Sequence, residues 1–335
     1  MRSSWQSLSP GHAASQPSNI SSKRTAHSGR RLTQALAPLL ISPNYQHPKG
    51  VAGAWLANWL ANSRFLRAVR RKVLAFLPFP VLESDVRDVL YLNWVVPTPL
   101  AQRVSPPGVS LEEVHGQSVF TVLIYRHGNF GPRFLGPLRR LLPSPLQSNW
   151  RFYVAGINQS PVTQPTVLFV RNFFNSALYA VGTRLGSDAL PSELPERFTY
   201  TSGSNLSSEL VDCNGHLQLK INAVVSDRKV LPETFICVFP SWEDAVANLT
   251  LQDSAVVQPP DLDCLAQAGI SLPIDLQSVR PVEANATYGY WLEQLGIAGT
   301  PLAFVVPSVK FQVLWEKVLA GANNSFKPKP LRGSA

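Results

Sequence analysis

The first 82 residues of this 335-residue chain contain no aspartate or glutamate. They carry eleven of the 30 lysine and arginine residues, so all 21 acidic side chains and the other 19 basic ones lie from Glu83 onward. The whole chain has a formal charge of +9, but the part after residue 82 has a charge of −2. The positive charge therefore belongs to the amino-terminal segment, and the sequence predicts no nucleic-acid-binding surface on the remainder.

Other absences exclude whole classes of protein. No run approaches the roughly 18 apolar residues that a membrane-spanning helix needs. The three cysteines, Cys213, Cys237 and Cys264, are odd in number and widely spaced, which fits a reducing compartment and no disulfide framework. No charged and then apolar stretch resembles a signal peptide. A soluble, cytoplasmic protein is therefore expected.

The usual motifs of cofactor and metal chemistry are missing as well. No Gly-rich phosphate loop and no G-x-S-x-G elbow occurs. From residue 83 onward the only histidines are His115, His127 and His216, and none has a cysteine or carboxylate at ligand spacing. The sequence therefore predicts neither a cofactor nor a metal site.

The amino-terminal segment divides into two parts. Residues 1–50 are rich in Ser, Gln, Pro and His, a composition typical of disorder, and residues 319–335 are expected to be a flexible tail. Residues 51–82 are predicted to contain a basic amphipathic helix. At 100° per residue its apolar face holds Trp55, Trp59, Leu66, Val69, Val73 and Phe76, and Arg64, Arg67 and Arg71 lie opposite.

Three interpretations of this helix stay open. Its apolar face can pack on the domain that follows, as most such faces do. Residues 51–77 can instead make peripheral contact with a membrane, because Trp, Phe and Leu opposite a basic face suit the interface. An acid-poor amino end rich in Ser and Arg is also typical of an organelle-targeting peptide.

Residues 83–318 are predicted to form one domain made mostly of strands. The predicted strands are short, rich in β-branched and aromatic residues and bounded by turn residues. They cover residues 88–96, 118–126, 149–157, 165–171, 197–203, 207–213, 216–225 and 309–315. Helices are few and do not alternate with the strands, which favours an α+β, mainly antiparallel architecture.

One family resembles this order of elements. The stretch DVLYLNWVVPTPLAQRVSPPGVSLEEVHGQSVFTVLIYRHG begins at Asp88, and NWRFYV (149–154) and TVLFVRNFFNSALYAVGTRLG (166–186) follow it. Together they resemble the family labelled domain of unknown function 2071, in the acetoacetate-decarboxylase-like superfamily, over residues 83–318. The resemblance implies a large closed β-barrel with a few helices outside it.

The candidate site lies on two of the predicted strands. In NWRFYV, the period of two puts Asn149, Arg151 and Tyr153 on one face, with Trp150, Phe152 and Val154 on the other. If the polar row lines the barrel interior, Arg151 can bind a carboxylate or phosphate. Arg171 and Asn172, where a strand ends and a helix begins, are the other predicted ligand-binding residues.

Two functions from different classes follow. The first is a barrel that binds an anionic or carbonyl small molecule without decarboxylase activity. The alternative is a decarboxylase-like enzyme acting on a small keto acid, because acetoacetate decarboxylase works through a Schiff-base lysine beside a second lysine. No lysine here follows another, and Lys220 is the weak candidate for a catalytic amine, with Glu283 as a candidate carboxylate. Gln147 stands where relatives carry a glutamate, and an amide is neither an acid nor a base.

Overall fold

The computed structural model describes residues 44–48 and 52–319. The disorder predicted for residues 1–43 and 320–335 concerns residues outside this described part. Residues 44–48 are packed: Tyr45 is buried, and its backbone N–H donates to Asn62 Oδ1 at 2.7 Å. The packed part of the chain therefore begins before the boundary predicted at residue 50.

The described residues form a 13-stranded sheet with few helices. The strand order is β4 (Gly131–Pro132), β1 (Leu82–Pro97), β3 (Gln117–Arg126), β5 (Leu146–Ile157), β6 (Ser160–Phe174), β10 (Ser254–Val257), β11 (Ala266–Ser271), β13 (Leu302–Val318), β12 (Arg280–Tyr288), β9 (Leu217–Val225), β8 (Asn205–Val211) and β7 (Arg197–Thr201), with β2 (Val109–Leu111) beside β5. β1 also pairs with β13. Between the named strands of the described residues the pairing of β6 with β10 is the parallel one, and an isolated parallel bridge joins Phe173 to Glu193. The architecture is α+β with a mainly antiparallel sheet, as the sequence predicts.

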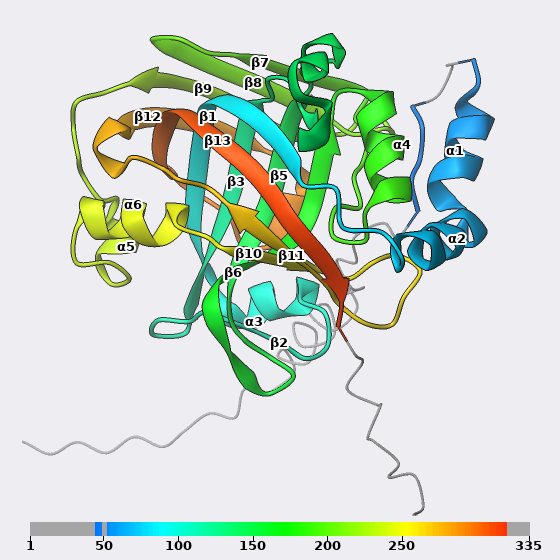
Figure 1. The fold of residues 1–335 in the computed structure, drawn as a ribbon. Coiled ribbons are helices and arrows are strands. Elements are labelled where there is room, and N and C mark those ends of the chain that lie inside the picture. Colours follow the sequence, from blue (N-terminus) through cyan, green and yellow to red (C-terminus); the bar gives the residue numbers. More distant parts are fainter. Residues whose placement is uncertain (1–43, 49–51, 320–335) are drawn as a thin grey trace, which may run out of the picture. The chain divides into compact units, whose positions relative to one another are not determined.

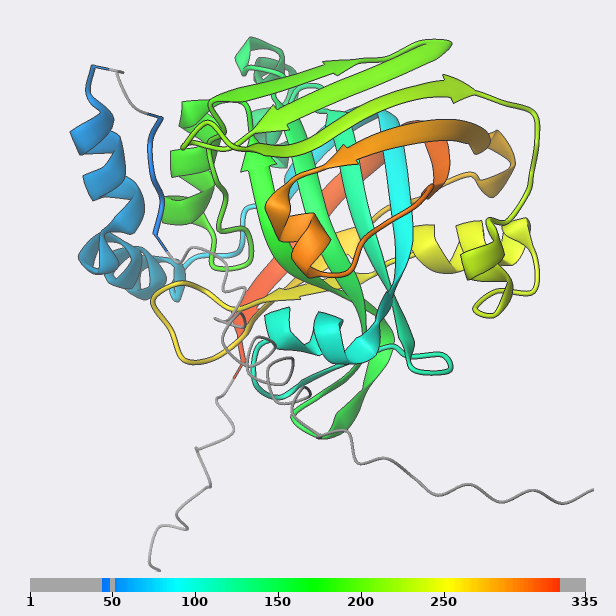
Figure 2. The ribbon, with the colours of Figure 1, turned by 180° about the vertical axis from the view of Figure 1, so that it is seen from behind.

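One face of the strands β1, β3, β5 and β6 is covered by a second layer of strands. Trp150 and Phe152 of β5 are buried there with Phe198 and Leu219 from β7 and β9. Figure 2 shows β7, β8 and β9 crossing over these strands. Strands provide most of this cover, because β7–β9 and β12 alternate apolar and polar residues and bury one face only. One short helix (Tyr290–Gln294) adds to it, since the Trp291 ring lies 5.4 Å from that of Trp150.

The opposite face of the same strands surrounds a second hydrophobic core. Tyr91 and Tyr153 lie in this core. The short helices α5 (Glu233–Ile236) and α6 (Trp242–Thr250) contribute Phe235, Trp242 and Leu249 to it. Ser241 caps α6 by accepting a hydrogen bond from Asp244 N at 3.0 Å. The period of two along β5 thus separates two chemically different environments.

The predicted amino-terminal helix is two helices. α1 (Ala54–Asn62) ends at Ser63, which is extended (φ −70°, ψ 105°) and whose hydroxyl accepts from Leu66 N to start α2 (Arg64–Leu74). Both pack beside α4 (Ala177–Gly186), as Figure 1 shows. The other helical segments are α3 (Thr98–Ala101), α7 (Tyr290–Gln294), η1 (Gln102–Val104), η2 (Arg133–Leu141) and η3 (Leu276–Ser278).

The orientation of α2 differs from the expectation that its apolar face packs on the domain. Arg67 is buried, whereas Val69 and Phe76 are exposed. The basic face turns inward because three carboxylates of the domain meet it there. No helix among residues 44–48 and 52–319 is both long and apolar enough to cross a membrane.

Candidate functional site

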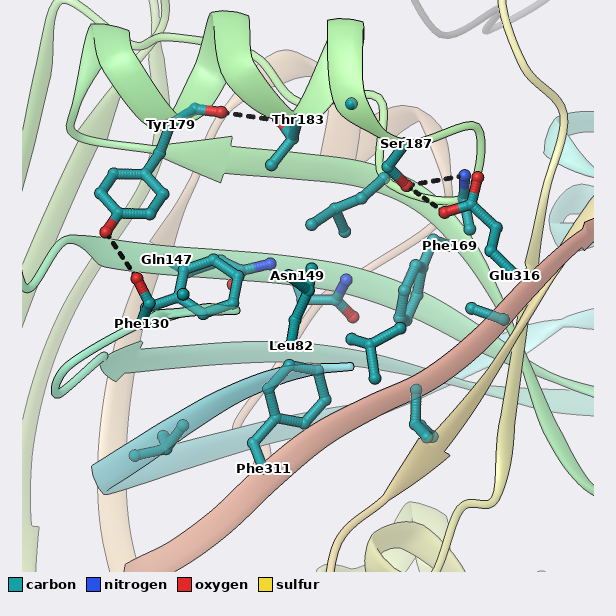
Figure 3. A pocket seen from close by; sticks show the side chains of 18 of the residues that line it. Leu82, Phe130, Gln147, Asn149, Phe169, Tyr179, Thr183, Ser187, Phe311 and Glu316 are labelled. Atoms are coloured by element: carbon teal, nitrogen blue, oxygen red, sulfur yellow. Dashed lines mark hydrogen bonds between the residues drawn. The ribbon is translucent and has the colours of Figure 1, made fainter. Parts of the chain in front are cut away.

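A cavity of about 440 Å³ lies between α4 and the strands β1, β5, β11 and β13. Figure 3 shows Tyr179 and Thr183 of α4 on one side of it and Phe311 of β13 on the other. Ser187, just after α4, donates a hydrogen bond to Glu316 of β13 at 2.6 Å. Most of the lining is apolar. β5 contributes the polar side chains of Gln147, Asn149 and Arg151 to the lining. Tyr153, the third residue of the predicted polar row, is buried in the adjoining core and does not line the cavity.

Arg151 is the charged group of the inner wall. Its side chain is 2% exposed, and Nη2 donates to the carbonyl oxygen of Leu249 at 2.9 Å. Tyr153 donates to the same carbonyl at 3.0 Å, and the Tyr91 and Tyr153 rings lie 5.6 and 5.7 Å from the guanidinium carbon. Leu249 lies in the last turn of α6, where unpaired carbonyls carry partial negative charge. The helix end thus stabilises the buried cation in part.

A full counter-charge for Arg151 is missing from the described part of the chain. No aspartate or glutamate among those residues forms an ion pair with it. Its Nε and the neighbouring Oδ1 of Asn149 are buried without a described hydrogen-bond partner. Such groups are costly to bury unpaired, so a donor and an acceptor without partners indicate a place for a polar ligand atom.

A chain of neutral side chains continues from this wall toward β1. His127 Nε2 faces Gln147 Oε1 at 2.6 Å, so Nε2 carries the proton, and Nδ1 faces Ser84 Oγ at 2.8 Å. Gln147 Nε2 donates to Asn172 Oδ1 at 2.7 Å, and Asn149 Nδ2 reaches the same oxygen at 3.5 Å. Burial lowers the pKa of His127 to about 4, although the hydrogen bond to Gln147 opposes the shift. His127 is therefore neutral at physiological pH.

This shift in the pKa of His127 predicts a pH-dependent stability. The pKa of 6.5 in the unfolded chain falls to about 4 in the folded one, so the contribution is complete above pH 6.5 and is lost as the pH falls toward 4. The loss is about 3 kcal/mol at 1.36 kcal/mol per unit. Urea unfolding at a series of pH values should give a flatter profile for His127→Gln over this range. Identical pH profiles of stability for the variant and the unaltered protein would contradict the contribution of His127.

The predicted pair Arg171 and Asn172 is divided between two sides of β6. β6 continues through both residues to Phe174, so their side chains alternate: Asn172 pairs with Asn149 and accepts a hydrogen bond from Gln147, whereas Arg171 pairs with Trp150 on the outer side. There Arg171 pairs with Glu193 at 2.7 Å and lies 5.5 Å from the Trp150 ring. Arg171 therefore does not share the cavity of Arg151, and it lines a second cavity of about 420 Å³.

The candidate catalytic residues lie away from the cavity. Lys220 is exposed on β9 and pairs with Glu209 at 3.3 Å. Glu283 is exposed on β12, where its Oε1 accepts from Ser226. No lysine belongs to the described residues that line the cavity. Lys220 therefore lies outside the cavity of Arg151, because β9 belongs to the covering layer and its polar face meets solvent.

α4 and the end of β13 also line the cavity, although no residue of either was among the predicted site residues. Tyr179, Gly182, Thr183 and Gly186 share one face of α4 and line the cavity. Two glycines four residues apart in a helix were the available signal, since glycine disfavours helices unless space is needed. Glu316 also lines the cavity, and burial raises the pKa of its carboxyl. Within residues 44–48 and 52–319, no group of three His, Cys, Asp or Glu could hold a metal ion.

Solved structures share this fold. An acetoacetate decarboxylase-like enzyme from Sphingomonas wittichii RW1 aligns with a TM-score of 0.52 and 11% identity over 72% of this chain and 94% of its own. The enduracididine biosynthesis enzyme MppR, with HEPES buffer bound, aligns with a TM-score of 0.50 and 13% identity over 73% and 89%. No protein-family model and no curated protein matches the chain. The chain therefore has the acetoacetate-decarboxylase-like fold, and membership of the domain of unknown function 2071 family stays a prediction.

Proposed function

We propose that this chain binds a small organic anion with an apolar body, without decarboxylase chemistry. The observation that carries the proposal is Arg151, a buried guanidinium in the wall of a mostly apolar cavity, which forms no ion pair with a carboxylate among the described residues. A carboxylate on Arg151 satisfies the charge, and Asn149 Oδ1 can accept from a hydroxyl beside it. The apolar lining then takes the hydrocarbon part of the ligand.

The strand pairing supports the proposal. Seven strands pair in sequence, from β1 through β3, β5, β6, β10 and β11 to β13, and β13 pairs with β1 again. We infer that they enclose the inner core and the cavity as a closed barrel, the architecture that the family resemblance implies. The structural neighbour MppR, which has HEPES bound, is a protein of this fold that holds a small molecule.

Replacement of Arg151 by methionine tests the proposal. Met keeps the apolar stem and removes the charge, so the affinity for decanoate should fall about 10- to 100-fold, the effect of losing one charge-assisted hydrogen bond of about 1.5–3 kcal/mol. Affinity for decanol, which carries no charge, should change little. Calorimetric titration with decanoate and with decanol measures the ratio of the two affinities in each variant.

Arg197→Met is the matched control for this experiment. Arg197 is exposed on β7 and pairs with Glu209, outside the cavity, so its loss should leave both affinities unchanged. An unchanged preference of Arg151→Met for decanoate over decanol would contradict the proposed anion site. Far-UV circular dichroism of each variant establishes that the fold is retained.

The decarboxylase-like alternative requires an amine in the cavity, and the described lining residues supply none. Borohydride reduction in the presence of pyruvate tests it directly. A covalent adduct would show that a lysine reaches the keto acid and would favour the enzyme. The expected result is no adduct, with Lys220→Met behaving as the unaltered protein does.

A further inference from the structure

The second amino-terminal helix, α2, turns its basic face inward, and both α1 and α2 leave large apolar side chains exposed. Arg67 of α2 is 4% exposed, and the Arg70 and Arg71 side chains are held by Asp188. The outward face carries large apolar side chains that no described residue covers. They are Trp55 (73% exposed), Trp59, Phe65, Val69, Val73 and Phe76 (89% exposed). A contiguous exposed surface of this kind marks an interaction site.

This outward face continues to the opening of the cavity. Leu74 at the end of α2 and Phe79 just beyond it line the cavity, and Phe76 and Leu77 between them are exposed. On the other side of the opening, Leu178 of α4 both lines the cavity and is 65% exposed. η2 adds Phe134, Leu138 and Leu141, all exposed, next to the lining residue Leu142. We call this set of exposed side chains from α1, α2, η2 and α4 the apolar rim.

The charges around the apolar rim have one sign. Residues 52–82 and 114–187, which include every rim element, contain no aspartate or glutamate. Arg64, Lys72, Arg133 and Arg140 are exposed beside the apolar side chains. Glu83, next to these elements, is buried and paired with Arg139. A partner for this surface must therefore offer an apolar region to the aromatic and aliphatic side chains and negative charges to the surrounding basic ones.

Other occupants fit this requirement poorly. A second copy of the chain would set the same basic fringe against itself, because a two-fold interface brings identical surfaces together. Residues 1–43 and 320–335 contain lysine and arginine but no aspartate or glutamate, so neither segment complements the fringe. An anionic bilayer complements both features of the rim. Trp and Phe side chains favour the headgroup region of a bilayer, and basic residues bind its negatively charged surface.

We propose that the apolar rim docks on an anionic phospholipid bilayer, with the opening of the cavity toward the membrane. Apolar anions that dissolve in the bilayer then reach the cavity without crossing water. Trp59, Phe65 and Phe76 of the rim do not line the cavity, so the docking can be tested separately from the anion site at Arg151.

Vesicle co-sedimentation of the full chain tests the proposal. The protein should sediment with vesicles of phosphatidylcholine and phosphatidylserine and much less with phosphatidylcholine alone. The triple variant Trp59→Ser, Phe65→Ser and Phe76→Ser should bind at least about tenfold more weakly, because each buried aromatic contributes strongly to transfer. These residues are exposed, so folding and decanoate affinity should be retained.

The matched control is Tyr290→Ser, an aromatic on α7 that is 71% exposed and belongs to the covering side of the fold. It should bind vesicles as the unaltered chain does. Equal vesicle binding by the triple variant, or sedimentation that is independent of phosphatidylserine, overturns the proposal. Concentration-dependent dimerisation abolished by the triple variant, with no vesicle binding, would instead identify a second copy as the occupant.

Discussion

Replacement of Gly182 by phenylalanine is expected to abolish decanoate binding and to leave the protein as stable as before or more stable. Gly182 lies on the cavity face of α4, and a Cβ added there meets no atom within 4 Å. The ring therefore has space to fold against the apolar wall, where burial contributes about 1.5–3 kcal/mol. It then fills volume that the ligand needs. Calorimetric titration and thermal unfolding measure the two effects.

Two further variants make this test decisive. Gly182→Ala adds a single methyl group and should raise the stability of α4 by about 0.5–1 kcal/mol while binding is retained. Ala268→Leu fills the cavity from β11, at a lining position that is 4% exposed and cannot turn its side chain to solvent. If both filling variants bind decanoate normally, the ligand does not occupy this cavity.

Replacement of Asp188 by asparagine should release α2 from the domain. The Asp188 carboxylate is 3% exposed and accepts from Arg71 Nε at 2.9 Å, while Arg70 approaches its other oxygen. The hydrogen bond to Asp188 is the largest influence raising the pKa of Arg71. Breaking a buried ion pair on one side costs about 3–5 kcal/mol because the remaining charges are left unpaired.

Asp188→Asn should detach α2 before it affects the folding of the rest of the domain. α2 is attached mainly through three arginines and the carboxylates of Asp188, Asp261 and Glu316, so limited proteolysis should cut between residues 52 and 82 much faster in the variant. Glu209→Gln, which alters an exposed ion-pair group, should change stability by less than about 1 kcal/mol. Unchanged protease resistance of Asp188→Asn would show that apolar contacts of α1 hold the segment instead.

Some of this arrangement follows from local patterns. The alternation in NWRFYV predicted that Asn149, Arg151 and Tyr153 share a face, and the two sides of β5 do meet different surroundings. The prediction for Arg171 and Asn172 placed them where a strand ends, but β6 continues to Phe174, so the same alternation puts the two side chains on opposite faces. The end of a strand depends on its pairing with a neighbouring strand, which a local pattern does not indicate.

In residues 51–77, too, the local pattern predicted the helix but not how it packs. Its 3.6-residue period predicted helix and two contrasting faces. The segment is helical as α1 and α2, and of these two helices α2 is the one with basic residues. Periodicity does not say which face docks. Here the inward face is the basic one, because Asp188 and Asp261, more than a hundred residues away in sequence, are brought beside Arg71. Packing of the apolar face was the reasonable expectation only in the absence of those carboxylates.

What the sequence by itself determined is the set of local structures: antiparallel strands, few helices, a basic amino-terminal segment and the inward row on β5. These depend on side-chain period and turn chemistry, which are properties of neighbouring residues. Only the tertiary structure decided that Arg151 meets the carboxyl end of α6, that glycines of α4 keep a cavity open and that Lys220 faces solvent. These facts depend on contacts between segments far apart in the chain, and desolvation and ion pairing at such contacts have no trace in local periodicity.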